Sequence, residues 1–215
     1  MDARERIAKR VAREFHNGDC VNLGIGLPTL VADHLPGDVR VILQSENGFL
    51  GLGPAAAPEK ADMDLVNAAG RPVTILPGGA SFDSATSFAI IRGGHVTAAV
   101  LGALEADEEG NLANWIIPGA LVPGMGGAMD LVTGARRVIL AMLHTSQGRP
   151  KILKRCTLPL TAVRAVHMIV TELAVFRYLP KLTLMELAPG VTTEQVRAAT
   201  SAHYDIAPDL KPMPV

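Results

Sequence analysis

Short apolar runs recur along the chain, and glycine-rich or proline-rich turns follow several of them. Five of these runs are typical of buried β-strands, since they are short and rich in branched aliphatic side chains. They cover residues 20–23, 39–43, 73–76, 96–101 and 137–143. Segments of helical periodicity separate them, which favours an α/β fold: an open, mostly parallel sheet with helices on both faces.

The segments between these runs carry the signals of helices and turns. Helices are predicted over residues 3–16, 29–35, 84–92 and 192–202, and an irregular hairpin over 102–116. Further strands over residues 166–171, 173–177 and 181–187 follow one another closely, so antiparallel pairing is expected at one edge of the sheet. We expect residues 1–215 to form one domain, because no repeat or linker interrupts the pattern.

Composition excludes several classes of protein. With 48% hydrophobic and 19% charged residues, the chain is not a disordered one. The net charge of -1 and the lack of a basic stripe argue against nucleic-acid binding. No apolar run reaches about 18 residues, so no membrane span is expected, and the charged residues 1–13 do not form a signal peptide. Cys20 and Cys156 are isolated, which indicates no metal site, no disulfide framework and a cytoplasmic location.

Glu46 is the residue with the clearest chemical potential. It lies in the segment 44–54, which directly follows the predicted strand 39–43, and it precedes Gly48, Gly51 and Gly53. In open α/β sheets, ligand crevices form at the carboxyl ends of strands. A carboxylate held there can act as a nucleophile or as a base. The alternative interpretation is an ordinary turn residue on a solvated loop.

Two glycine-rich segments differ in what they predict. Residues 24–26 lack the third glycine of a dinucleotide-binding loop, so a tight strand-to-helix turn is the better interpretation. Gly124, Gly126 and Gly127 precede an expected helix start near Ala128. Their backbone N–H groups could stabilise an oxyanion, or the glycines could serve a turn with positive φ.

The histidines and cysteines are weaker candidates for catalysis. His144 ends a strand and is interpreted as a satisfied residue at the sheet rather than as a base, and His95 and His167 are interpreted as structural. The chain has no Gly-x-Ser-x-Gly motif. Glu46 therefore remains the best nucleophile.

The motif Ser45-Glu46-Asn47-Gly48 resembles the nucleophile motif of family I coenzyme A transferases. Within that family the chain is similar to the β subunits of 3-oxoacid coenzyme A transferases, most of all to the bacterial acetate/acetoacetyl-CoA type. The stretches that carry this resemblance are VNLGIGLPTLVA (21–32), QSENGFLGLGP (44–54), FDSATSFAIIRGGH (82–95), DEEGNLANWIIPG (107–119), VPGMGGAMDLVTGARRVI (122–139), KILKRCTLPLT (151–161) and VTELAVFR (170–177).

The resemblance implies a fold shared with some sugar-phosphate isomerases and a covalent, ping-pong reaction. Glu46 would attack an acyl-CoA and become a glutamyl-CoA thioester, from which a short-chain carboxylate such as acetoacetate takes the coenzyme A. Gly126, Gly127 and Ala128 would donate to the oxyanions, while Asn47 and Gly48 would shape the turn. No metal or other cofactor is implied, since the coenzyme A thioester is a substrate.

The resemblance also implies a partner. Family members need an α-type half with another coenzyme A loop, so an α subunit and an α₂β₂ assembly are expected. Two features depart from the family pattern: Leu143 stands before His144 where an acidic or amide residue is common, and residues 55–63 match nothing specific.

Two other functions stay open at this point. One is a transferase for a dicarboxylic 3-oxoacid such as 3-oxoadipate, and the other is a non-catalytic module that binds acyl-CoA. The intact motif around Glu46 argues against the second.

Overall fold

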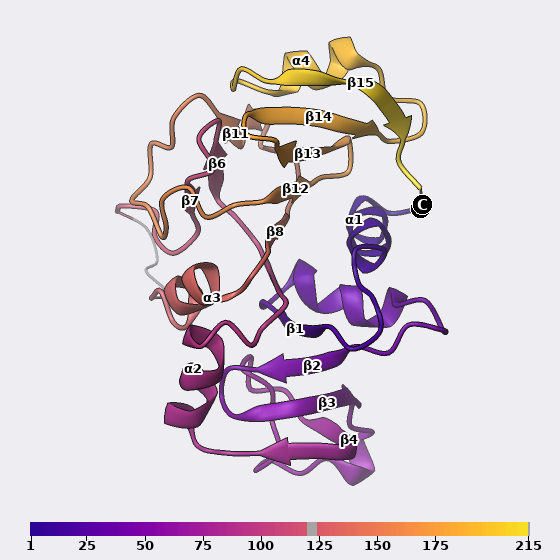
Figure 1. The fold of residues 1–215 in the computed structure, drawn as a ribbon, viewed down its shortest axis with the longest axis vertical. Coiled ribbons are helices and arrows are strands. Elements are labelled where there is room, and N and C mark those ends of the chain that lie inside the picture. Colours follow the sequence, from indigo (N-terminus) through magenta and orange to yellow (C-terminus); the bar gives the residue numbers. More distant parts are fainter. Residues whose placement is uncertain (120–123, 215) are drawn as a thin grey trace.

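A ten-stranded sheet runs through the computed structural model, which describes residues 1–119 and 124–214 (Figure 1). Its strands lie side by side in the order β15 (Asp205–Pro212), β14 (Leu182–Leu187), β13 (Ala174–Tyr178), β12 (Met168–Val170), β8 (Val138–Ala141), β5 (Ala98–Leu101), β1 (Cys20–Leu23), β2 (Ile42–Ser45), β3 (Phe49–Ala55) and β4 (Val73–Ser81). The five strands from β12 to β2 are parallel. Antiparallel pairs flank them on both sides, at β12–β13–β14 and at β2–β3–β4. The expected open α/β sheet is therefore confirmed, including its antiparallel late strands.

Helices cover both faces of the sheet, as the sequence predicts (Figure 1). The helical elements are α1 (Ala3–Ala12), α2 (Ser84–Arg92), α3 (Ala128–Gly134), α4 (Thr193–Ala199) and the 3₁₀ segments η1 (Leu27–His34) and η2 (Pro58–Lys60). One buried cluster joins α1 and η1 to one face, and the other joins α2, α3 and α4 to the opposite face.

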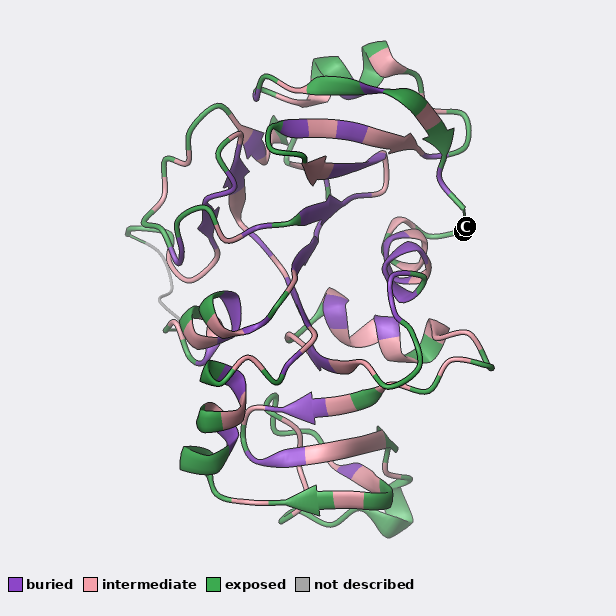
Figure 2. Ribbon diagram, in the orientation of Figure 1, coloured by how far each residue is buried: buried purple, intermediate pink, exposed green. Residues whose placement is uncertain are grey.

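Side chains of the central strands alternate between these two clusters. On β5, Val100 packs in the cluster of α1, while Leu101 packs in the cluster of α2 and α3. On β8, Ile139 and Leu140 divide in the same way. All positions of both strands are buried, which explains why they are continuous apolar runs without polar alternation (Figure 2).

A small sheet lies beside the large one and accounts for the predicted irregular hairpin. It is formed by β7 (Leu112–Ala113), β6 (Glu105–Asp107) and β11 (Ile152–Leu153). The turn between β6 and β7 is closed by Asp107, whose Oδ1 accepts hydrogen bonds from the backbone N–H groups of Glu109 and Asn111. A short hairpin of β9 (Thr145–Ser146) and β10 (Arg149–Pro150) follows β8.

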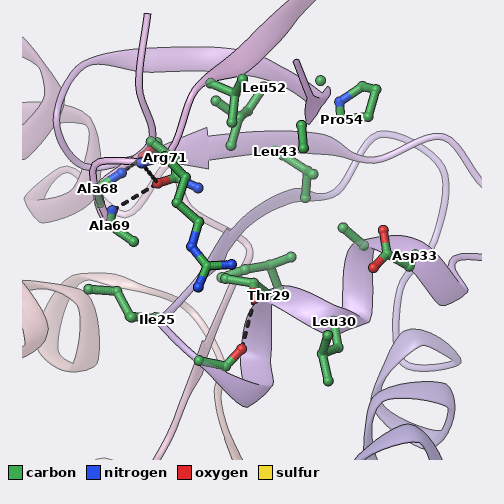
Figure 3. Close-up of a pocket in the computed structure, with 18 of the residues that line it drawn as sticks. Ile25, Thr29, Leu30, Asp33, Leu43, Leu52, Pro54, Ala68, Ala69 and Arg71 are labelled. Carbon is green, nitrogen blue, oxygen red and sulfur yellow. Dashed lines mark hydrogen bonds between the residues drawn. The ribbon is translucent and has the colours of Figure 1, made fainter. Parts of the chain in front are cut away.

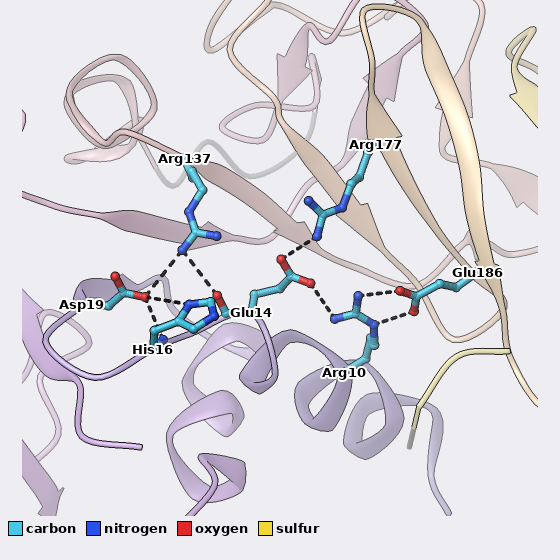
Figure 4. A network of polar contacts seen from close by, with 7 residues as sticks. All are labelled: Arg10, Glu14, His16, Asp19, Arg137, Arg177 and Glu186. Carbon is cyan, nitrogen blue, oxygen red and sulfur yellow. Dashed lines mark hydrogen bonds and ion pairs between the residues drawn. The ribbon is translucent and has the colours of Figure 1, made fainter. Parts of the chain in front are cut away.

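An ionic network fastens α1 to the C-terminal strands (Figure 4). Arg10 is 4% exposed and donates two hydrogen bonds to Glu186, of 2.6 and 2.7 Å, and one of 2.8 Å to Glu14. Glu14 also accepts a hydrogen bond of 2.7 Å from Arg177. Each buried charge of this network thus has a partner of opposite sign.

The strands around the hairpin β3–β4 differ from the prediction. The glycines and prolines of residues 51–54 and 77–79 were expected to end strands, yet both segments lie within β3 and β4. The glycines serve a close approach of the two backbones instead, because a Cβ at Gly51 would lie 2.8 Å from the Cα of Gly79. The pairing shifts register between Leu50 and Leu52.

Several predicted boundaries are also wrong. The strand predicted over 39–43 begins only at Ile42, which is 45% exposed, and its buried residues are the polar Gln44 and Ser45. The helices predicted over 3–16 and 192–202 end at Ala12 and Ala199. No pattern in the sequence predicted β15, whose two prolines are tolerated because it forms the edge of the sheet.

Candidate active site

Glu46 lies at the tip of the hairpin between β2 and β3. Ser45 and Phe49 pair across this hairpin, and the N–H of Gly48 donates to the carbonyl of Ser45 at 3.0 Å. Gly48 has a φ of 125°, and a Cβ there would collide with the carbonyl oxygen of Phe82. Only glycine fits at this position, so the turn that presents Glu46 depends on it.

Asn47 anchors the same turn from its exposed side. Its Nδ2 donates to the carbonyl of Val66 at 2.7 Å, and its Oδ1 accepts from the hydroxyl of Ser45 at 2.7 Å. The hydroxyl of Ser45 in turn accepts from the N–H of Ala68 at 3.2 Å. The side chain of Asn47 thus ties the hairpin to the loop before β4 and is not directed at a ligand.

The structure brings Glu46 next to Gly127, although the two are far apart in the sequence. A Cβ built on Gly127 would lie 3.2 Å from Oε1 of Glu46 and 3.3 Å from Cε1 of Phe88. Gly127 has a φ of -80° and precedes the first residue of α3, so its lack of a side chain serves this close approach and not a positive φ. The carboxylate and the glycine segment therefore form one site.

The other members of the glycine segment are less uniform. Gly126 has a φ of 54°, which favours glycine, and has open space where a Cβ would be. The N–H of Ala128 donates to the carbonyl of Met125 at 3.2 Å, so it closes a turn in this conformation. Val122 and Pro123, which begin the predicted segment, lie outside the described residues.

The electrostatic setting of Glu46 is unusual for a half-buried carboxylate. In the described part of the chain, no lysine, arginine or histidine forms an ion pair with it. Burial raises the pKa of Glu46, and a hydrogen-bonding contribution from the Asn22 side chain opposes this rise. Desolvation without a counter-charge destabilises the ionised form of a carboxylate. This makes the carboxylate a better nucleophile.

A chain of buried amides and a hydroxyl supports the strands beneath Glu46, and sequence reasoning missed it. Nδ2 of Asn22 on β1 donates to Oε1 of Gln44 on β2 at 2.6 Å, and Nε2 of Gln44 donates to the hydroxyl of Ser87 on α2 at 3.0 Å. All three residues are almost fully buried, and Oδ1 of Asn22 has no hydrogen-bond partner among the described residues. The available signal was a polar residue inside each of two short strands.

A cavity of about 590 Å³ lies next to the segment η1 (Figure 3). The segment η1, the strand β3 and the loop before β4 form its walls. Leu43 and Gln44 of β2 also line it, although the side-chain amide of Gln44 donates to Ser87 on α2. The side chain of Arg71 extends across the cavity toward Thr29, as Figure 3 shows. Glu46 is not part of its lining.

His144 and His167 have hydrogen-bond partners within the fold. His144 is fully buried, and its ring nitrogens lie 2.9 Å from the hydroxyls of Thr171 and Thr200. Burial lowers the pKa of His144 to about 4, so the ring is neutral at physiological pH. Leu143, the residue that departs from the family pattern, is 36% exposed beside it. Nδ1 of His167 accepts from the N–H of Val138 at 3.1 Å, which is a structural role.

Two observations hold within residues 1–119 and 124–214. No group of three or more His, Cys, Asp or Glu residues in these two ranges is arranged to hold a metal ion. Within the same residues, no helix has both the length and the apolar character needed to cross a bilayer.

Comparisons with known proteins bear on the family of the chain. The model of the coenzyme A transferase family matches residues 4–199. The chain is 62% identical over 212 residues to the beta subunit of the acetate CoA-transferase of Escherichia coli K12, covering 98% of this chain and 97% of that protein. It is 50% identical over 208 residues to one subunit of the probable succinyl-CoA:3-ketoacid coenzyme A transferase of Bacillus subtilis, covering 96% of each.

A solved structure supports the fold independently. The acyl-CoA transferase YdiF of Escherichia coli O157:H7 matches with a TM-score of 0.78 at 22% identity. The match covers 99% of this chain and 43% of the YdiF chain. The present fold thus corresponds to less than half of that longer protein.

Proposed function

The chain belongs to the coenzyme A transferase family, and we propose that Glu46 is the nucleophile with which it acts as the β subunit of an acetate/3-oxoacid coenzyme A transferase. The activity and the subunit type follow from relatives that match the chain over nearly its whole length. The role of Glu46 rests on one observation of the structure. Its desolvated carboxylate has no ion-pair partner in the described residues and faces the backbone of Gly127.

The proposed reaction has two halves of the same kind. An oxygen of Glu46 attacks the thioester carbonyl of an acyl-CoA, and the coenzyme A thiolate leaves, which gives a mixed anhydride. The thiolate then attacks the glutamyl carbonyl and releases the acyl group as a free carboxylate. Glu46 now carries coenzyme A as a thioester. An incoming carboxylate reverses these steps and departs as the new acyl-CoA.

Each tetrahedral intermediate places negative charge on an oxygen next to Glu46. We assign the stabilisation of this charge to the backbone of Gly126 and Gly127, because a Cβ on Gly127 would lie only 3.2 Å from Oε1 of Glu46. Ala128 takes part only if the bond from its N–H to Met125 opens. Asn47 and Gly48 hold the turn that presents Glu46.

The Escherichia coli relative is named as a beta subunit, which implies an α-subunit partner. An α₂β₂ assembly is our proposal, with the site completed at the interface between the halves. That residues 1–215 form a single domain is also a proposal, supported by the continuous ten-stranded sheet. The cytoplasmic location expected from the sequence remains part of the same proposal.

The decisive experiment traps the covalent intermediate. The α–β complex is incubated with acetoacetyl-CoA without an acceptor, then treated with borohydride, which reduces a glutamyl thioester to an alcohol. We expect a mass change on the peptide that contains Glu46, and none in Glu46→Gln. Glu59→Gln, at an exposed glutamate outside the site, is the matched control and keeps the adduct. An active complex without an adduct on this peptide would exclude the covalent role of Glu46.

A further inference from the structure

We propose that Arg92 is a positioning residue that masks the charge of Asp130, so that the glycine segment beside Glu46 can stabilise an oxyanion. This inference rests on the proposed function, because it concerns the same developing charge. It assigns a task to two residues that do not touch Glu46 in the structure and that lie on different helices, α2 and α3.

The ion pair is well formed. Nε of Arg92, in the last turn of α2, donates to Oδ1 of Asp130, in the first turn of α3, at 2.7 Å. The guanidinium of Arg92 also lies 5.6 Å from the centre of the Phe88 ring, one turn earlier on α2. Stacking on an aromatic ring restricts the guanidinium and holds it over Asp130.

Phe88 connects this pair to the candidate active site. Its ring edge is 3.3 Å from the position that a Cβ on Gly127 would take, and Oε1 of Glu46 is 3.2 Å from the same position. Asp130 follows Gly127 by three residues at the start of the same short helix. The ion pair, the aromatic ring, the glycine and the carboxylate therefore form one contiguous group of contacts.

The need for masking follows from the charge of Asp130. Its side chain is only 26% exposed, so water screens its charge incompletely. An unpaired carboxylate so close to Gly127 would repel the anion that forms on the thioester oxygen. Arg92 compensates that charge, and it is the cation that pairs with Asp130 among the described residues.

The opposite end of α3 is fixed without the ion pair. The carbonyl of Ile91 occupies the position of a Cβ on Gly134, so the helices α2 and α3 touch there through their backbones. Nε of Arg136 also donates to the carbonyl of Gly94 at 2.8 Å. Loss of Arg92 should therefore leave the packing of α2 and α3 in place, because exposed ion pairs contribute little to stability.

The test compares three variants of the α–β complex: Arg92→Gln, Asp130→Asn and the double variant. We expect Arg92→Gln to lower kcat and the rate of adduct formation on Glu46 by about tenfold, with KM and thermal stability nearly unchanged. Asp130→Asn should lose little. The double variant should recover the rate of Asp130→Asn, because no charge is left to mask.

Two results would overturn the inference. One is Arg92→Gln with the wild-type rate, and the other is a double variant as slow as Arg92→Gln, which would show that the pair acts through geometry. Lys211→Gln, which removes an exposed ion pair to Asp209, is the matched control and should keep full activity. A wild-type complex without any Glu46 adduct would instead refute the proposed function, so the two failures are distinguishable.

Discussion

The carboxylates in two regions of the molecule differ in their ion-pair partners. Glu14 and Glu186 lie between α1 and the C-terminal strands, and arginines hold the oxygens of both (Figure 4). Glu46 lies at the hairpin β2–β3, where burial raises its pKa and no described residue forms an ion pair with it. Arginines thus balance the charge of the carboxylates in the first region, and no described side chain does so in the second.

This difference separates structural from chemical use of the same side chain. A carboxylate with two charge-assisted hydrogen bonds is a poor nucleophile, because its electron pairs are engaged. A carboxylate that faces amide groups and a bare glycine backbone is free to attack an electrophile. The comparison predicts that substitutions on the two sides change different observables, stability in one region and turnover in the other.

The largest effect is expected from the paired side. Arg10→Met leaves Glu186, whose side chain is 14% exposed, without its arginine and removes one of the two partners of Glu14. Removing one partner of a buried ion pair costs about 3–5 kcal/mol. We expect a loss of this size in urea unfolding of the isolated chain, while the folded complex keeps its turnover.

Arg177→Met is the matched control for this prediction. Arg177 is 40% exposed, and Glu14 keeps Arg10 when it is removed. We expect a cost of about 1 kcal/mol or less. Equal losses for the two arginines would show that the network acts as one unit, and the contrast between its buried and exposed members would then be wrong.

The next effect concerns turnover on the unpaired side. Gly127→Val places a branched side chain against Oε1 of Glu46 and the Phe88 ring. The φ of -80° is compatible with valine, so the change acts by crowding and not by backbone strain. A displacement of the carboxylate by about 1 Å can cost ~10² in rate, and we expect a loss of that order in kcat.

Thermal unfolding must accompany these kinetics. Gly37→Val is the matched control, because a Cβ there has open space and its φ is not in the left-handed region. It should keep both turnover and stability. If Gly127→Val unfolds in proportion to its loss of activity, the glycine has a structural role and its approach to Glu46 carries no catalytic meaning.

The sequence predicted most of the fold because its signals are local. The strand Cys20–Leu23, the helix Ser84–Arg92 and the turn at Asp107 each depend on residues adjacent in the chain. Prediction failed where glycine had a tertiary purpose. Gly51 and Gly79 allow two backbones to approach within a sheet, and a local interpretation takes them as turns.

The site was predictable in part for the same reason. The local motif predicted a catalytic role for Glu46, which stays a prediction, while the resemblance to coenzyme A transferases is confirmed. The buried Asn22, Gln44 and Ser87 were missed, because their hydrogen bonds join three separate elements. The pairing of Arg10 with Glu186 spans almost the whole chain, and no spacing rule relates residues so far apart.

The smallest effect is a gain of stability from removing the charge of Glu46. Burial raises the pKa of Glu46 above its value in the unfolded chain, so between these two values the folded state binds more protons. Stability contributed by the protonated form is therefore lost as pH rises through the raised pKa. Glu46→Gln removes the charge and should raise Tm slightly at pH 7.5 while turnover is abolished.

The pH dependence distinguishes this account from a simple change in packing. At pH 4 the native carboxyl is largely protonated and already neutral, so the difference in Tm between wild type and Glu46→Gln should shrink there. A packing effect would be the same at both pH values. A lower Tm for Glu46→Gln at pH 7.5 would mean that the ionised carboxylate stabilises the fold, as it does at Glu14, and the contrast between the two regions would fail. A gain in Tm for Glu46→Gln at neutral pH that disappears in acid would show that the desolvated charge of Glu46 itself lowers the stability of the fold.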